Sequence, residues 1–224
     1  MTFTYYFWYT LSKITARLFF SIRVLHSDRL IEEGPVILAS NHQSYFDPPL
    51  VGICSKRDVY YLARKTLLDV PLLGNLLPHI NVIPVDRDGN DMSALKTIIR
   101  LVRSGNGVVL FPEGTRSPDG SLLRGKQGIG LIIAKSRAPV QPIRIFGAHE
   151  AFPKGSGKIT AVPITVVIGH PIRFTDEELD PSSCGGNERA LYQKLSDRVM
   201  EEIAALELPE SLPSGKTAVR LNAS

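Results

Sequence analysis

The stretch GPVILASNHQSYFDPP, residues 34–49, carries the signals that decide the fold. Its apolar part, Val36–Ser40, is short and follows a Gly-Pro breaker, which is typical of a buried strand. Its last three residues are Asp47 and two prolines, and they predict the start of a helix with Asp47 as the N-cap. A buried strand, a polar loop and a helix in this order indicate an α/β fold.

The same alternation of strands and helices continues along the rest of the chain. Short apolar runs bounded by breakers predict strands at 59–62, 82–85, 108–111, 140–146 and 164–168. Apolar periodicity predicts helices at 91–103 and 188–206. We also predict a helix at 125–135 and short helices around Pro71 within 65–74. We therefore predict an α/β fold with a largely parallel sheet flanked by helices. In such sheets, binding and catalytic sites gather beyond the carboxyl ends of the strands.

Length and composition limit the class of protein. A chain of 224 residues with 43% hydrophobic and 21% charged residues has the composition of one globular domain, which excludes a disordered protein. Two cysteines exclude a disulfide scaffold and a four-cysteine metal site, and they favour a reducing compartment. The net charge of +4 gives only a mild bias toward anionic partners.

The first 27 residues differ from the rest. They are rich in aromatic side chains, and they contain Lys13, Arg17 and Arg23 but no acid. We predict that residues 1–27 form an amphipathic helix in the interface of an anionic membrane, the alternative being a helix packed on its own domain. Residues 28–208 would then form the globular domain and 209–224 a flexible tail. This organisation predicts a peripheral or monotopic protein on the cytoplasmic face of a membrane.

One polar loop follows the first predicted strand. It places His42 and Asp47 at the carboxyl end of that strand, just before the helix. A neutral imidazole accepts a proton near pH 7 when a partner fixes its other ring nitrogen. Asp47 has two oxygens, so it could hold His42 with one and cap the helix with the other. The alternative is an ordinary capped loop with a satisfied histidine.

A second polar loop, FPEGTRS at 111–117, follows another predicted strand. Its glycine allows backbone N–H groups to approach an anion, and Arg116 offers a planar fork of donors for phosphate. Glu113 could orient a basic residue or accept from a substrate hydroxyl; a β-turn with a surface ion pair is the alternative. Further cations that could join this site are Arg87, Lys65 and Lys126. Together they predict a phosphomonoester site.

Other chemistries have no support in the sequence. The glycine-rich motifs of nucleotide binding and the serine motif of covalent hydrolases are missing. The five histidines lack the spacing of metal ligands, so we expect no metal ion and no tightly bound cofactor. Cys54 lies in an apolar helix and is interpreted as a packing residue.

Taken together, these segments resemble the glycerolipid acyltransferases, specifically the 1-acylglycerol-3-phosphate acyltransferases. The resemblance runs from about residue 30 to 175. Its first block stands as Asn41-His42-x4-Asp47, its second as Ile83–Arg87, its third is intact at Phe111–Ser117, and its fourth is Ala138–Pro142. The second block departs from the family pattern, with Asn81 near its start and Pro84-Val85 before Arg87. The stretch after the third block lacks the family's phenylalanine and reads Gly125-Lys126-Gln127-Gly128.

The resemblance implies an activity and a role for each of these residues. His42 would be the general base and Asp47 its orienting partner, in a direct transfer without an acyl-enzyme. The acyl group would pass from acyl-CoA or acyl-carrier protein to the sn-2 hydroxyl of lysophosphatidic acid, making phosphatidic acid in phospholipid biosynthesis. The glycerol phosphate would be held by Arg87, Glu113, Gly114, Thr115 and Arg116, with Asn41, Lys65 and Lys126 as lesser candidates.

The partners implied are therefore lysophosphatidic acid, a thioester donor and an anionic membrane surface, and not nucleic acid. Two alternatives stay open at this point. The same chemistry could serve glycerol-3-phosphate or another lysophospholipid, because sequence motifs do not specify the pocket walls that set the shape of the acceptor. The protein could also be a non-catalytic lipid-binding module, although phosphate binding alone would not require a positioned base.

Overall fold

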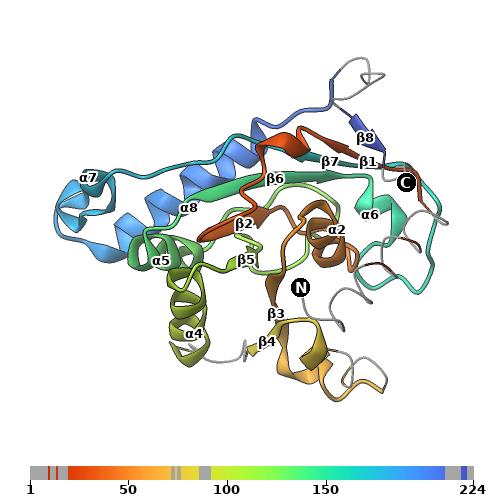
Figure 1. Cartoon of the computed structure of the whole chain (residues 1–224), viewed down its shortest axis with the longest axis horizontal. Helices are drawn as coiled ribbons and strands as arrows, with labels where there is room; N and C mark the ends of the chain where they lie inside the picture. Colours follow the sequence, from red (N-terminus) through yellow and green to blue (C-terminus); the bar gives the residue numbers. More distant parts are fainter. Residues whose placement is uncertain are drawn as a thin grey trace.

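A computed structural model describes residues 20–71, 77–85, 92–209 and 218–220, together with Thr10, Ile14 and Gly74. Its centre is an eight-stranded sheet in the order β4-β3-β5-β2-β6-β7-β1-β8 (Figure 1). The strands are β1 (Ile22–Leu25), β2 (Val36–Ser40), β3 (Val59–Arg64), β4 (Val82–Val85), β5 (Gly107–Leu110), β6 (Val140–Phe146), β7 (Ile164–Ile168) and β8 (Ala218–Arg220).

The sheet is largely parallel, as predicted. Within the described residues, the pairs β6–β7 and β1–β8 are antiparallel, and every other neighbouring pair is parallel. Strands β4, β3, β5, β2 and β6 therefore run in one direction. Their carboxyl ends lie at one edge of the sheet, which we call the carboxyl edge, and the opposite end of these strands is the amino edge.

Helices cover both faces of the sheet. The α-helices are α2 (Asp47–Cys54), α4 (Met92–Arg103), α5 (Gln127–Ser136), α6 (Ala148–Ala151), α7 (Asp176–Leu179) and α8 (Glu188–Ala204). Short 3-10 helices are η1 (Ser27–Arg29), η2 (Lys65–Leu67), η3 (Leu77–His79) and η4 (Pro181–Cys184). Figure 1 shows α4, α5 and α8 together on the left of the view and α2 and α6 on the right.

Strand β2 explains why there are two layers of helices. Successive side chains of a strand point to opposite faces, and every residue of β2 is buried. Ile37 and Ala39 join a core built with α4, α5 and α8. Val36 and Leu38 join the other core, built with α2 and α6. An apolar run without alternation is thus what a central parallel strand requires.

Two helices of the first core touch through their backbones. A Cβ atom added to Gly130 of α5 would lie 1.9 Å from the carbonyl oxygen of Tyr192 in α8. Only glycine allows this approach, so Gly130 sets the distance between the two helices.

The predicted N-terminal helix is wrong at its carboxyl end. Residues 22–25 form strand β1, which pairs in parallel with β7, and residues 27–29 form a 3-10 helix. Ile22, Val24 and Leu25 are buried in the sheet, so the apolar residues here serve a strand and not a membrane face. The described residues Thr10 and Ile14 are helical, and the rest of the prediction, over 1–19, lies outside the described residues.

The predicted flexible tail, 209–224, is also corrected in part. Ala218–Arg220 forms β8 and pairs antiparallel with β1, so the backbone of β1 is hydrogen-bonded on both sides. The remaining tail residues, 210–217 and 221–224, lie outside the described residues. In the part of the chain that the structure describes, no helix has the length and apolar character needed to cross a membrane.

Candidate active site

The two polar loops predicted from the sequence meet at the carboxyl edge. Strands β2 and β5 are parallel neighbours, paired from Val36 with Gly107 to Ala39 with Leu110. The loops that follow these two strands therefore begin side by side, which brings Asn41–Asp47 against Phe111–Ser117. The main chains are joined directly, because the amide of Ser117 donates to the carbonyl oxygen of His42 at 2.7 Å.

His42 and Asp47 form the predicted pair. Nδ1 of His42 lies 2.8 Å from Oδ2 of Asp47, whose side chain is completely buried. A carboxylate oxygen accepts, so Nδ1 carries the hydrogen and Nε2 is left as the proton acceptor. Among the described residues, Nε2 has no hydrogen-bond partner. The side chain of His42 is 11% exposed, so the ring is shielded yet still reaches the surface.

Asp47 does not cap the helix as predicted. The N-cap of α2 is Phe46, and Asp47 is the first helical residue. Its Oδ2 turns back into the loop and also accepts from the backbone amides of Gln43 at 2.6 Å and Ser44 at 2.7 Å. Its Oδ1 has no partner among the described residues. One oxygen therefore holds both the loop and the imidazole, and these bonds stabilise a buried carboxylate.

The loop that contains Phe111 and Glu113 contacts the ring face and the backbone amide of His42. The Phe111 ring stacks on the imidazole, with 4.0 Å between ring centroids and 19° between planes. Oε1 of Glu113 accepts the His42 backbone amide at 3.0 Å. The Glu113 residue is only 1% exposed, and burial raises its pKa to about 7, although the backbone amides of His42 and Leu123 oppose the rise. Glu113 thus faces the loop of His42.

Asn41 joins the loop to β6. Its Nδ2 donates to the carbonyl oxygen of Ile145 at 3.0 Å, and its Oδ1 accepts the Ile145 amide at 2.8 Å. The side chain acts as an extra peptide group where the backbone of β2 leaves the sheet. Nε2 of Gln43 donates to the same Ile145 oxygen at 2.8 Å. The role of Asn41 in the structure is to fix the start of the loop, and it is 4% exposed.

The cations at this edge come from several segments. Arg116 lies with its guanidinium carbon 3.5 Å from the ring centroid of Tyr45. Stacking of this kind uses the face of the guanidinium and leaves its in-plane donors for an anion. Lys126 approaches Gly114, where a Cβ atom would lie 3.0 Å from the lysine Cδ. Gly114 has a φ of +65°, so glycine is favoured there.

The other predicted phosphate ligands are less closely placed. Thr115 lies between Gly114 and Arg116 and is partly exposed. Lys65 is exposed directly after β3, whose carboxyl end lies at the same edge. Arg87 lies outside the described residues. No sequence pattern marked Tyr45, Phe111 or Ser117 as site residues. Tyr45 and Phe111 act through ring faces and Ser117 through its backbone amide, and a polar motif does not reveal such contacts.

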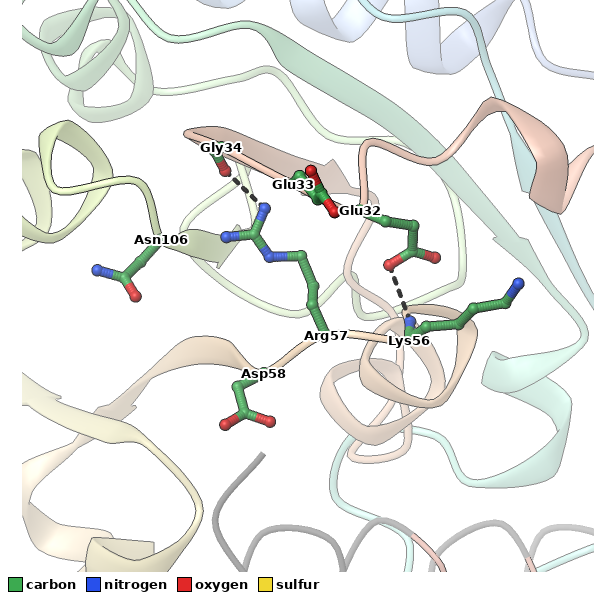
Figure 2. A pocket seen from close by; sticks show the side chains of 7 residues that line it. All are labelled: Glu32, Glu33, Gly34, Lys56, Arg57, Asp58 and Asn106. Carbon is green, nitrogen blue, oxygen red and sulfur yellow. Dashed lines mark hydrogen bonds between the residues drawn. The ribbon is translucent and has the colours of Figure 1, made fainter.

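The pocket in Figure 2 belongs to the opposite end of the strands. Its residues Gly34, Asp58 and Asn106 stand just before β2, β3 and β5, at the amino edge. Arg57 crosses it, donating to the carbonyl oxygens of Gly34 at 2.5 Å and Gly105 at 2.6 Å. We interpret it as a polar network that fastens three strand starts, and we do not assign the reaction to it.

Comparison with known proteins shows the family of the chain. The family model for acyltransferases matches residues 21–146, more than half of the chain. The chain belongs to the acyltransferase family. The matched region contains both loops, the His42–Asp47 pair and the five parallel strands up to the end of β6.

Several relatives of this chain share one name. A chloroplastic 1-acyl-sn-glycerol-3-phosphate acyltransferase of Brassica napus is 35% identical over 66% of this chain and 43% of its own length. A 1-acyl-sn-glycerol-3-phosphate acyltransferase of Bacillus subtilis is 29% identical over 80% of this chain and 87% of its own length. The chain spans 52% of a relative from Limnanthes alba, so it covers about half the length of the plant proteins.

A solved structure shares the architecture. The crystal structure of the 1-acyl-sn-glycerophosphate acyltransferase of Thermotoga maritima superposes with a TM-score of 0.67 and 26% identity. The match covers 90% of this chain and 81% of the other. The fold is therefore common to almost the whole chain and not only to the loops that carry the motifs.

Proposed function

We propose that this acyltransferase-family protein moves a fatty acyl group from a thioester to the sn-2 hydroxyl of 1-acylglycerol-3-phosphate, making phosphatidic acid. The observation that carries the proposal is the 2.8 Å contact between Nδ1 of His42 and Oδ2 of buried Asp47. A module that only bound phosphate would need cations but no oriented base. The names of the relatives, including one matched over 80% of this chain, support lysophosphatidic acid as the acceptor.

The proposed reaction is a direct transfer. Nε2 of His42 takes the proton of the sn-2 hydroxyl while the hydroxyl oxygen attacks the carbonyl carbon of the thioester. The carbon–sulfur bond then breaks, and the protonated imidazole returns the proton to the leaving thiolate. Asp47 keeps the ring in one orientation and stabilises its positive charge. A thioester is already activated, so this chemistry requires no metal ion and no bound cofactor.

The phosphate of the acceptor would lie beside His42. Arg116 offers its in-plane donors, and the exposed Lys126 adds a second cation next to Gly114. The positive φ of Gly114 turns the loop tightly, which lets the backbone approach an anion. Arg87, outside the described residues, and Thr115 are proposed as further ligands. Acyl-CoA or acyl-carrier protein would supply the acyl group.

We also propose that the protein works on a membrane surface, since both the lipid substrate and the lipid product belong to a bilayer. Residues 1–19 and the net charge of +4 favour the anionic, cytoplasmic face. The protein would then be peripheral or monotopic.

Thiol release from oleoyl-CoA in micelles tests the proposal. The acceptors to compare are lysophosphatidic acid, glycerol-3-phosphate and lysophosphatidylcholine, each with the wild type and with His42→Ala. We expect release with lysophosphatidic acid, and we expect His42→Ala to lower turnover on the order of 10²–10⁴-fold, the usual contribution of a general base. His149→Ala is the matched control, because this histidine lies outside the proposed machinery.

Other outcomes would change the assignment. Release with another acceptor would keep the chemistry and replace the substrate. Unchanged turnover in His42→Ala would remove His42 from the mechanism. Silence with all acceptors, with acyl-carrier protein as well as CoA donors, would contradict an enzymatic role and favour a lipid-binding module.

A further inference from the structure

Glu113 is placed where it can act on His42 but not on a substrate. Its Oε1 accepts the backbone amide of His42 at 3.0 Å, and the residue is 1% exposed. Four residues further along the chain, the Ser117 amide donates to the carbonyl oxygen of His42 at 2.7 Å. Both hydrogen-bonding groups of the His42 backbone are thus held by one segment, which starts from the neighbouring strand β5.

The charge of Glu113 argues against the phosphate-binding role that the family resemblance implied. The ionised form of Glu113 repels a phosphate dianion. A residue that binds the acceptor phosphate must also expose its polar atoms, and Glu113 is almost completely buried. A second carboxylate, Asp47, lies close enough to raise the pKa of Glu113 further. Glu113 therefore contributes to the site through its hydrogen-bond acceptor oxygen, and its negative charge is unfavourable there.

We infer that Glu113 is a positioning residue, which fixes the backbone of His42 so that the imidazole stands between Asp47 and the acceptor hydroxyl. The inference rests on the proposed function. Asp47 holds the ring nitrogen and the amides of Gln43 and Ser44, but it makes no hydrogen bond to the backbone N–H or C=O of His42 itself. The Glu113 bond and the Ser117 bond hold these two groups. A misplacement of about 1 Å costs roughly 10²-fold in rate, so the held backbone matters for turnover.

Three substitutions at this position separate the hydrogen bond from the charge. Glu113→Gln keeps an acceptor oxygen at the same reach and removes the charge. Glu113→Asp keeps the charge but is shorter by one methylene, so it cannot reach the amide. Glu113→Ala removes both. The matched control is Glu202→Ala, an exposed glutamate of α8.

Steady-state kinetics with lysophosphatidic acid as acceptor gives the first readout. We expect Glu113→Gln to keep kcat within about 3-fold of the wild type, and Glu113→Asp and Glu113→Ala to lower it by roughly 10–100-fold. The KM for the acceptor should change by less than about 3-fold in all of them. A rise in KM without loss of kcat would overturn the inference and restore Glu113 to the phosphate site. Full activity of Glu113→Asp would overturn it as well.

Amide hydrogen exchange at His42 gives a second readout that does not depend on turnover. We expect the His42 amide to be protected in the wild type and in Glu113→Gln, and to exchange at least about 10-fold faster in Glu113→Ala, where the amide has lost its acceptor. Equal protection in all variants would contradict the inference. An inactive wild type with the expected exchange pattern would instead reject the proposed function and leave the placement of His42 by Glu113 intact.

Discussion

The chemistry of this site depends on contacts of single residues that cannot be predicted from the residue type alone. Asp47 was expected to divide two oxygens between a histidine and a helix cap, yet Oδ2 alone takes three hydrogen bonds. The predicted contact between His42 and Asp47 is present, and their catalytic role stays a proposal. The sequence could not show the burial of Glu113, because burial depends on segments far apart in the sequence.

Tyr45 provides a prediction at this scale. Its ring carries the Arg116 guanidinium and is itself supported by Phe152, with 5.2 Å between ring centroids. Replacing Tyr45 by Leu removes a contact worth about 0.5–2 kcal/mol, so the KM for lysophosphatidic acid should rise by roughly 2–30-fold while kcat changes little. Tyr45→Phe keeps the ring and should match the wild type. Equal KM values for the Leu and Phe variants would show that the stacking does not orient Arg116.

Glu113 provides a prediction about stability and pH. Burial raises its pKa from 4.5 to about 7, so between these values the folded protein binds more protons than the unfolded chain. Stability is therefore highest below pH 4.5 for this group and falls as pH rises toward 7. Relative to Glu113→Gln, the free energy of unfolding of the wild type should fall by up to about 1.4 kcal/mol per pH unit in that window. Denaturant unfolding at several pH values would test this, and parallel curves for the two proteins would contradict it.

At the scale of elements, periodic helices and fully apolar strands were predictable, and strand β1 was not. Helix 92–103 and strands β2, β4, β6 and β7 lie where the pattern predicted them. Strand β1 contains Arg23, and it follows an aromatic segment whose pattern is also typical of an amphipathic helix. Its identity depends on pairing with β7, about 140 residues later, and no local pattern carries that information.

Helix packing gives a prediction with a control in the same helix. Gly130→Ala would place a methyl group 1.9 Å from the Tyr192 carbonyl oxygen, so α5 and α8 would have to separate. We expect the free energy of unfolding to fall by about 1–3 kcal/mol, as for other overpacked cores. Gly128→Ala, where nothing lies within 4 Å, should be neutral or slightly stabilising. Chemical denaturation of both variants measures the difference, and equal effects would mean that the helices do not touch as described.

At the scale of the whole molecule, the sequence predicted the architecture and the edge at which the two polar loops meet. Alternating elements required a parallel sheet, and the polar strand exits marked the carboxyl edge. The additions made by β1 and β8 extend the far side of the sheet and were not predicted, because they pair residues near the two ends of the chain. The membrane interface helix stays a prediction over residues 1–19.

Truncation tests this prediction without harming the sheet. A deletion through residue 24 would remove buried Ile22 and Val24, so the deletion should end at residue 19 and keep Phe20, whose ring packs against Phe46 at 5.1 Å. We expect the shortened protein to keep its thermal transition and to lose co-sedimentation with vesicles containing anionic lipid. Vesicles of neutral lipid serve as the control. A shortened protein that still co-sediments would show that membrane contact lies elsewhere on the chain.

The polar network at the amino edge offers a place to attach a label or a linker to the protein. Arg57 holds the starts of β2 and β5 there, and Lys56 lies next to it in the pocket (Figure 2). Lys56 is exposed, and this edge is the end of the strands opposite to His42. A dye or a linker placed at residue 56 alone, by a chemistry that spares the other lysines, would stand clear of the reacting lipid. The protein could then be immobilised on a sensor chip in one orientation, with its carboxyl edge turned toward a supported bilayer.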